Sequence, residues 1–291
     1  GIDLVNPHWI VPQGLTAAMW RRTLGVPTVV TAHGADVALL GRMRAGSAIG
    51  RHVFSRCEGL ISDSSYLARR TEEIIGREIV HEAIPMGVAT SRFQPGARPA
   101  TLGAAGAVPV VLFVGKFVLK KGIPVLLEAV AELKASGRRV SLLLIGGGPL
   151  ERSLRDLADG LGISDDVRFV GWVKNEELPS YYAAADIVCV PSIQDAHGET
   201  EGTPVVLQEA LACGGLVVAS RSSGIADVIR DGENGWSVPP GDAEALAHAE
   251  REALHALAGD GVEAREPDHL VDTAVRDAVG RGEGTQVPAG A

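Results

Sequence analysis

Apolar and amphipathic stretches alternate along most of this chain. Residues 110–114 form an unbroken apolar run, and the next stretch carries Leu126, Val130 and Leu133 at helical spacing behind Pro124. Further strands are expected at residues 140–145, 167–170, 186–191, 216–219 and 236–238, and further helices at 150–161, 176–185, 204–212 and 225–230. Because several strands have no polar position, they are expected to be buried on both faces. The pattern predicts βαβ units in a parallel, doubly wound sheet.

The first hundred residues show the same alternation more sparsely. Strands and helices are expected there at residues 28–31, 59–62, 16–24 and 66–75. The stretch between Pro95 and Pro109 consists mainly of small, loop-forming residues, which makes it the best candidate for a linker.

The sequence therefore predicts an α/β protein with two Rossmann-like domains that face a cleft. We expect a partial amino-terminal domain at residues 1–98, a linker at 99–108, a second domain at 109–258 and an irregular tail at 259–291. Residue 1 is a glycine followed directly by a strand-like stretch, so the first domain is expected to be incomplete.

Composition narrows the classes of partner. The formal net charge is −9, so there is no basic field to hold a polyanion and a nucleic-acid partner is not expected. Three scattered cysteines indicate neither a disulfide framework nor a zinc site, and they fit a reducing cytoplasm. No apolar run reaches the roughly 18 residues of a membrane-spanning helix. Peripheral contact with the inner face of a membrane is compatible with this composition.

The strongest candidate site is the segment from Glu201 to Glu209. The first glutamate lies in an expected loop and the second in a helix that Pro204 helps to start. Gly202 allows close approach of a ligand to the backbone, and the free amides of the first helical turn suit an anion such as a diphosphate. The alternative is an amphipathic surface helix with solvated glutamates.

Two further segments carry candidate chemistry. Lys116 and Lys121 follow Gly115 at the carboxyl end of the first strand of the second domain, where ligands bind in open parallel sheets. Their ammonium groups would neutralise a diphosphate, although a lysine-rich surface turn is the alternative. His33 follows the strand near residue 30 and lies beside Gly34, so it either reaches a ligand or is a loop residue with a local partner. The glycines at 146–148 would allow a ligand to approach the backbone closely, but turn chemistry explains them equally well.

Taken in this order, these elements resemble the group 1 glycosyltransferases, the retaining family 4 enzymes with the GT-B fold. The resemblance covers about residues 1–250. Its motifs lie at residues 31–36, 84–88, 93–95, 114–122, 145–149, 169–172, 185–192, 201–214, 231–235 and 238–242.

The resemblance implies roles for the matching residues of the second domain. Glu201 and Glu209 match the family's E-x7-E motif, in which the first glutamate contacts the donor sugar and the second holds the nucleotide ribose. Gly202 and Thr203, ahead of Pro204, match the place where backbone amides meet the sugar and phosphates.

The resemblance also implies roles for the basic residues. Lys116 and Lys121 match the pair that binds the donor diphosphate, and His33 matches a histidine of the amino domain that reaches toward the donor sugar. Members of the family are thought to work without a metal. No metal or other cofactor is therefore expected, which agrees with the lack of an Asp-x-Asp pair beside a strand end.

Four departures from the family pattern are visible. Position 116 is usually arginine, and the usual Pro-Asn-Gly turn reads Pro85-Met86-Gly87 here. The family's first strands and their glycine-rich loop would precede residue 1, and its closing helix has no match after Gly259.

The leading hypothesis is a retaining transferase that moves a hexose-type sugar from a UDP- or GDP-sugar to an unidentified hydroxyl acceptor, in polysaccharide or glycolipid synthesis. A nucleotide-sugar-binding fragment without turnover is a second hypothesis. A glycoside hydrolase that uses Glu201 and Glu209 as acid and base is a third, since their spacing alone does not exclude it. A GT-B epimerase or phosphorylase matches the motifs less well.

Overall fold

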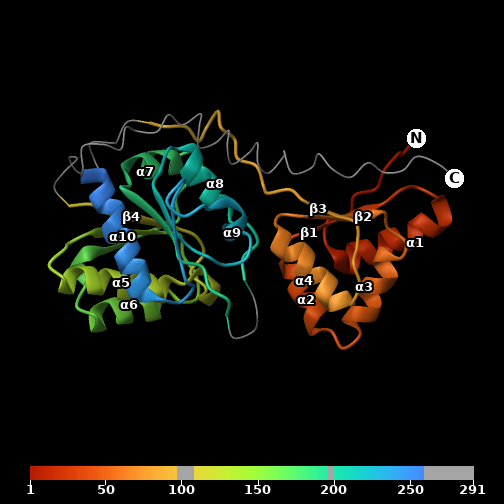
Figure 1. The fold of residues 1–291 in the computed structure, drawn as a ribbon, viewed down its shortest axis with the longest axis horizontal. Helices are drawn as coiled ribbons and strands as arrows, with labels where there is room; N and C mark the ends of the chain where they lie inside the picture. Colours follow the sequence, from red (N-terminus) through yellow and green to blue (C-terminus); the bar gives the residue numbers. More distant parts are fainter. Residues whose placement is uncertain (97–107, 196–199, 259–291) are drawn as a thin grey trace. The chain divides into compact units, whose positions relative to one another are not determined.

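The structure is a computed structural model that describes residues 1–96, 108–195 and 200–258. It divides into two compact units, one formed by Gly1–Met86 and one that begins at Gly87. Each unit combines a parallel sheet with helices (Figure 1). The predicted tail and all but one residue of the predicted linker lie outside the described residues.

The first unit is built on a three-stranded parallel sheet in the order β1-β2-β3. Two parallel bridges, Val5 to Thr28 and His8 to Thr31, place residues 5–8 alongside β1. Its elements are η1 (Ile10–Gly14), α1 (Leu15–Leu24), β1 (Val29–Ala32), α2 (Ala35–Arg42), α3 (Gly46–Phe54), β2 (Gly59–Ser62), α4 (Ser65–Ile75) and β3 (His81–Ala83).

Helix α4 illustrates how local sequence sets an element of this unit. Ser64 caps its start by accepting a hydrogen bond from the Leu67 amide, and Gly76 ends it with φ of 71°. Leu67 and Ile75 lie on its buried face and join the core of the unit beside Leu60 of β2. The cap, the apolar face and the terminal glycine all favour the same helix.

The second unit begins earlier in the chain than the sequence suggested. Phe93 is 3% exposed and packs edge-on against Tyr182, with 6.0 Å between the ring centroids. This aromatic contact places Phe93 in the second unit, whereas the sequence expectation carried the amino domain to residue 98.

The second unit contains a six-stranded parallel sheet in the order β6-β5-β4-β7-β8-β9. Its strands are β4 (Val110–Val114), β5 (Ser141–Ile145), β6 (Val167–Gly171), β7 (Ile187–Val190), β8 (Val217–Ser220) and β9 (Trp236–Val238). Its helices are η3 (Leu119–Lys121), α5 (Ile123–Ala135), α6 (Glu151–Gly160), η4 (Ser164–Asp166), α7 (Leu178–Ala184), α8 (Val205–Ala212), α9 (Ile225–Val228) and α10 (Ala243–Ala258).

Successive residues of the strands enter two separate cores. Val111 and Phe113 of β4 pack in the cluster that includes α5 and α10, while Val110 and Leu112 pack in the cluster that includes α7 and α8. Both faces of the sheet are therefore covered by helices, as Figure 1 shows. This confirms the doubly wound sheet predicted from the unbroken apolar strands.

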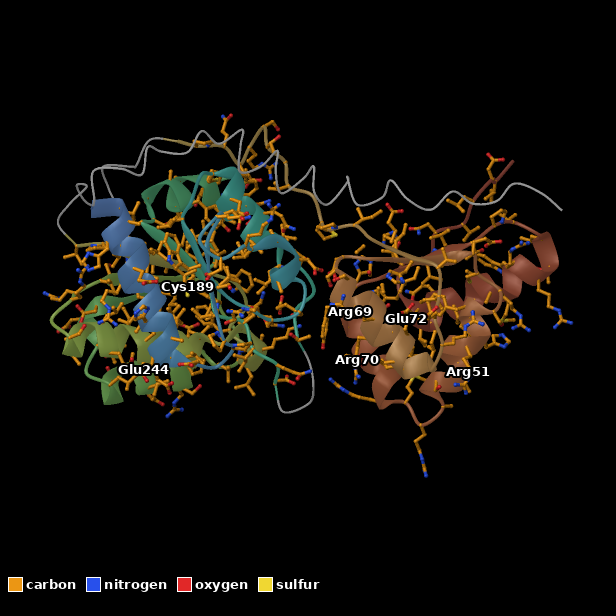
Figure 2. All side chains as sticks on the ribbon, in the orientation of Figure 1. Arg51, Arg69, Arg70, Glu72, Cys189 and Glu244 are labelled. Atoms are coloured by element: carbon orange, nitrogen blue, oxygen red, sulfur yellow. The ribbon has the colours of Figure 1, made fainter. Side chains whose placement is uncertain are left out.

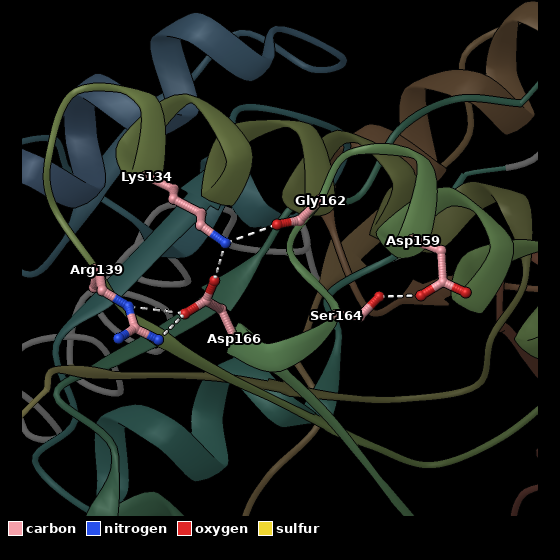
Figure 3. Close-up of polar contacts among 6 residues, drawn as sticks. All are labelled: Lys134, Arg139, Asp159, Gly162, Ser164 and Asp166. Carbon is pink, nitrogen blue, oxygen red and sulfur yellow. Dashed lines mark hydrogen bonds and ion pairs between the residues drawn. The ribbon is translucent and has the colours of Figure 1, made fainter.

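A charged cluster joins the residue before β6, Asp166, to the end of α5 and to the segment before β5 (Figure 3). Lys134 Nζ and Arg139 Nη2 lie 2.8 and 2.7 Å from the two carboxylate oxygens of Asp166, whose side chain is 4% exposed. Lys134 also donates to the Gly162 carbonyl at 2.7 Å. Hydrogen bonds from Lys134 and Arg139 hold the pKa of the Asp166 carboxyl below its ordinary value.

Asp166→Asn is expected to lower the free energy of unfolding at pH 7 by about 2 kcal/mol, because it removes the charge on which both cations converge. Since the pKa of Asp166 is lower in the folded state, the stabilisation is present above the ordinary carboxyl pKa of about 4 and is lost as the pH falls below it. Urea unfolding at pH 7 and pH 3 measures this, with the exposed neighbour in Asp165→Asn as the control. An equal loss at both pH values would contradict the account.

Candidate active site

The chain reverses its direction of travel across the second sheet at β4. It runs outward through β5 to β6 and then returns to β7 on the other side of β4. The loops after β4 and β7 therefore leave the same edge at a topological switch point, where ligands bind in open α/β sheets. The Ile193 amide donates to the Lys120 carbonyl at 2.9 Å and joins the two loops.

Gly122 permits this close approach of the two loops. Its φ is 67°, and a Cβ there would lie 1.8 Å from the Pro191 carbonyl oxygen. Any other residue would push the β4 loop away from the β7 loop, so the glycine is required by backbone packing.

The two loops bring together a carboxylate and two ammonium groups. Lys121 Nζ lies 2.9 Å from Glu201 Oε2, and Lys120 Nζ lies 3.4 Å from Glu201 Oε1. Glu201 and Lys121 are largely buried, with side chains 12% and 16% exposed. The structure thus brings together two residues that were singled out in the sequence and adds Lys120. The sequence did not single out Lys120, because two adjacent lysines give no indication of which side chain faces the site. The three groups together carry one net positive charge, which suits an anionic ligand.

Lys116 lies in the same loop but does not join this cluster. Its side chain is exposed and has no ion-pair partner in the described part of the chain. The preceding residue, Gly115, donates its amide to the Ile145 carbonyl at 2.9 Å. Among the described residues, Lys116 is therefore an unpaired cation in the loop that also carries Lys120 and Lys121.

The glycine run after β5 has a packing role. A Cβ at Gly146 would lie 2.0 Å from the Gly115 carbonyl oxygen, and one at Gly148 would lie 2.6 Å from the Phe117 carbonyl oxygen. The Phe117 amide donates to the Gly147 carbonyl at 3.0 Å. These glycines let the β5 loop lie directly against the β4 loop and so support the lysines.

The start of α8 lies next to Glu201. Pro204 is the residue before the helix, with φ of −64°, and Gly202 and Thr203 link it to Glu201. Thr203 is 4% exposed, and its hydroxyl donates to the Gly224 carbonyl at 3.4 Å. In the first turn of α8 the Leu207 amide donates to the Pro204 carbonyl at 2.9 Å. The start of the helix brings the positive end of its dipole beside the lysines.

Glu209 lies further along α8 with a partner that the sequence did not reveal. The Tyr182 hydroxyl donates to Glu209 Oε2 at 2.7 Å, and Glu209 is 8% exposed. Burial raises the pKa of Glu209, and the hydrogen bond from Tyr182 acts in the opposite direction. Burial and the neighbouring Glu209 charge raise the pKa of the Tyr182 hydroxyl, so it remains a donor. Within the described residues, Glu209 Oε1 has no hydrogen-bond partner and can accept from a ligand hydroxyl.

His33 belongs to the first unit and has a local partner there. Its Nε2 lies 2.8 Å from His8 Nδ1, and the two rings stack with centroids 5.0 Å apart. The buried carboxylate of Asp36 accepts from the His33 and Ile10 amides at 2.9 and 2.8 Å and fixes the turn after β1. Because His8 occupies Nε2, a ligand can meet only Nδ1 of the His33 ring in this arrangement. The role of His33 toward a donor sugar stays a prediction.

For the described residues, the structure also bears on metal binding and on membrane crossing. In the parts of the chain that the structure covers, no three His, Cys, Asp or Glu side chains are grouped so that they could hold a metal ion. None of the helices in those parts combines the length and the apolar character needed to cross a membrane.

The sequence is similar to those of known sugar-transferring proteins. Residues 99–257 match the family described as glycosyl transferases group 1. The chain is 32% identical over 243 residues to a GDP-mannose-dependent alpha-(1-6)-phosphatidylinositol monomannoside mannosyltransferase of Mycolicibacterium smegmatis, with 82% of this chain and 63% of that protein covered. It is 34% identical over 241 residues to the putative colanic acid biosynthesis glycosyltransferase WcaL of Escherichia coli, with 81% and 58% covered. The chain thus spans about three fifths of the length of these relatives.

The fold is shared with solved structures. Sucrose-phosphate synthase from Thermosynechococcus elongatus aligns with a TM-score of 0.76 and 26% identity, over 97% of this chain and 72% of that one. HepE of Anabaena, in complex with UDP, aligns with a TM-score of 0.75 and 19% identity, over 96% and 74%. The chain belongs to the glycosyl transferases group 1 family and has the GT-B fold.

Proposed function

We propose that this protein moves a hexose-type sugar from a UDP- or GDP-sugar to a hydroxyl acceptor, with retention of configuration at the anomeric carbon. The observation that carries the proposal is the cluster of Lys120, Lys121 and Glu201 at the switch point, beside the start of α8. Cationic side chains and the start of a helix lie together there, a combination that would suit a diphosphate.

In this reaction the bond between the anomeric carbon and the diphosphate oxygen breaks, and its electrons leave with the diphosphate. The acceptor oxygen bonds to the same carbon, and its proton passes to a phosphate oxygen of the leaving group. Lys116, Lys121 and the first-turn amides of α8 would stabilise the charge that grows on the leaving group. A diphosphate that binds Lys121 competes with Glu201 for the ammonium group, so the carboxylate becomes available to the hydroxyls of the donor sugar. This account needs no metal, and independence from metals stays a prediction.

The relatives support the donor class and suggest the setting. One similar protein is named as dependent on GDP-mannose, and HepE has been solved with UDP and with UDP-glucose. Other relatives are named for colanic acid and amylovoran biosynthesis. We therefore propose a role in polysaccharide or glycolipid synthesis, in the cytoplasm or at the inner face of the membrane.

Stabilisation by nucleotide sugars tests the donor class directly. A ligand present at 100 times its Kd stabilises the folded state by about 2.7 kcal/mol, which a thermal shift detects. We expect one UDP- or GDP-sugar to raise the Tm and the other nucleotide sugars, including an ADP-sugar, to raise it less. No shift with any of them, together with wild-type behaviour of Lys121→Ala, would refute the proposal.

Two competing functions would give different results with the same protein. A binding unit without turnover would show the thermal shift but no transfer and no hydrolysis of the donor. This alternative is kept because Lys116, Lys121, Glu201 and Glu209 all lie in one unit, which could bind a donor by itself. A glycoside hydrolase would release sugar from an oligosaccharide in the absence of nucleotide.

Tyr182→Phe tests the proposed ribose contact of Glu209. The change removes the hydroxyl that orients Glu209 Oε2, so we expect nucleoside diphosphate binding to weaken by about tenfold, the effect of one lost hydrogen bond to a charged group. Calorimetric titration measures this. Tyr181→Phe, on the neighbouring residue of α7, is the matched control and should bind as the wild type does. Unchanged affinity in Tyr182→Phe would remove Glu209 from the account of the ribose.

A further inference from the structure

Hydroxyl groups connect the loop after β7 with the loop after β8. Thr200 Oγ1 and Ser223 Oγ lie 2.8 Å apart, and Thr203 Oγ1 donates to the Gly224 carbonyl at 3.4 Å. We call Thr200, Thr203, Ser223 and Gly224 the hydroxyl clamp. Nearby, the Ser222 hydroxyl donates to the Ser192 carbonyl at 3.2 Å and joins the same two loops at a third point.

The clamp brackets the dipeptide Glu201–Gly202. Thr200 precedes it and contacts Ser223, whereas Thr203 follows it and contacts the next residue, Gly224. The backbone on either side of Glu201, the residue proposed to contact the donor sugar, is therefore tied to a single short segment after β8. That segment is in turn anchored by Ile225, which is fully buried in the core of the second unit.

Ser223 has a backbone conformation that L residues rarely adopt. Its φ is 44°, and it is one of two non-glycine residues with positive φ in the described ranges. Glycine takes this conformation freely, whereas a serine there carries steric strain. Strained positions of this kind cluster at functional sites, and here the strained residue supplies the hydroxyl that contacts Thr200.

We propose that Ser223 is a positioning residue that holds Glu201 in place when the donor binds; this rests on the proposed function. In the structure the Glu201 carboxylate is held by Lys120 and Lys121. A bound diphosphate attracts the same ammonium groups and weakens that restraint. The clamp acts on the backbone and involves no charge, so it keeps Glu201 at the sugar after the lysines turn to the phosphates.

Ser223→Gly separates this role from a contribution to folding. Glycine relieves the strained φ, so we expect the Tm to stay within a few degrees of that of the wild type. The loss of the hydroxyl should lower kcat about tenfold, while KM changes by less than about twofold, because ground-state binding rests on the lysines and α8. Thr200→Val should have the same effect, and the double variant should lose no more than either single one. Ser180→Ala, at an exposed serine of α7, is the control.

Hydrogen exchange gives a readout that does not depend on transfer. The amides of Gly202 and Thr203 should exchange faster in Ser223→Gly and Thr200→Val than in the wild type or Ser180→Ala. Unchanged exchange, or additive losses of kcat in the double variant, would overturn the clamp. If the wild type transfers no sugar from any donor, the proposed function fails, and the exchange rates still decide whether the clamp holds this loop.

Discussion

Replacing Lys121 by alanine is expected to lower the rate of sugar transfer by about 100- to 1,000-fold, the range for removing one preorganised charge-stabilising donor from an active site. Lys121 is the closest cation to Glu201, at 2.9 Å, and its side chain is largely shielded from water. A charge in such a place stabilises a leaving diphosphate more strongly than a solvated lysine does. The loss should appear in kcat, because the charge on the leaving group is greatest in the transition state, and KM for the donor should rise as well, because Lys121 also holds the diphosphate of the bound donor.

Initial rates with saturating donor measure this prediction. Lys174→Ala removes an exposed lysine of the same unit and should leave the rate unchanged. Lys121→Arg keeps the charge but changes its shape, so its rate should lie between those of the wild type and Lys121→Ala. A Lys121→Ala protein that transfers sugar at the wild-type rate would contradict the role given to this residue.

A carboxyl group inside the second unit should make stability depend on pH. Glu250 of α10 is 0% exposed, and in the described residues its carboxylate has no hydrogen bond to nitrogen or oxygen and interacts with the Cys189 thiol. Burial raises its pKa to about 8. Cys189 of β7, visible in the interior of the unit in Figure 2, interacts electrostatically with it, and burial likewise raises the pKa of this thiol.

Glu250→Gln is expected to stabilise the protein at pH 8 by an amount on the order of 4 kcal/mol, at about 1.4 kcal/mol per pKa unit. In the folded state Glu250 stays protonated up to about pH 8, whereas in the unfolded state it ionises near 4.5. The unfolded state therefore binds fewer protons between these values, and the free energy of unfolding falls as the pH rises through this window. Glutamine is neutral in both states and removes that fall.

Urea unfolding at pH 5 and pH 8 measures the effect. The gain from Glu250→Gln should be small at pH 5 and large at pH 8. Glu244→Gln is the matched control, since Glu244 is exposed on the same helix, as Figure 2 shows. Equal gains at both pH values, or a loss at pH 8, would contradict burial of a neutral Glu250.

Glu250 also explains why the sequence did not predict α10. The buried positions Leu246, Ala247, Ala253 and Leu254 follow helical spacing, but a glutamate occupies the central buried position. Strands such as β4 and β7 were predictable because their runs are apolar throughout. Strand β3, His81–Ala83, was not, since none of its three residues is buried and two are polar.

The sequence singled out several residues of the candidate site, but not the partners that they contact. Glu201 and Lys121 were identified from the order of elements along the chain, and the structure brings them into contact. Tyr182 and His8 contact residues far away in sequence, Glu209 and His33, and no local pattern indicates which tyrosine or histidine folds back. Such pairs are set by the packing of whole helices and strands.

The central claim is that the second unit holds a nucleoside diphosphate through Lys120, Lys121 and the start of α8. Calorimetric titration of the wild type and Lys121→Ala with UDP, GDP and their parent nucleosides, uridine and guanosine, tests it most directly. We predict that one diphosphate binds the wild type at least about tenfold more tightly than its nucleoside, a difference of about 1.4 kcal/mol, and that this gap closes in Lys121→Ala. Failure of both diphosphates to bind, or an equal gap in the wild type and the variant, would contradict the account.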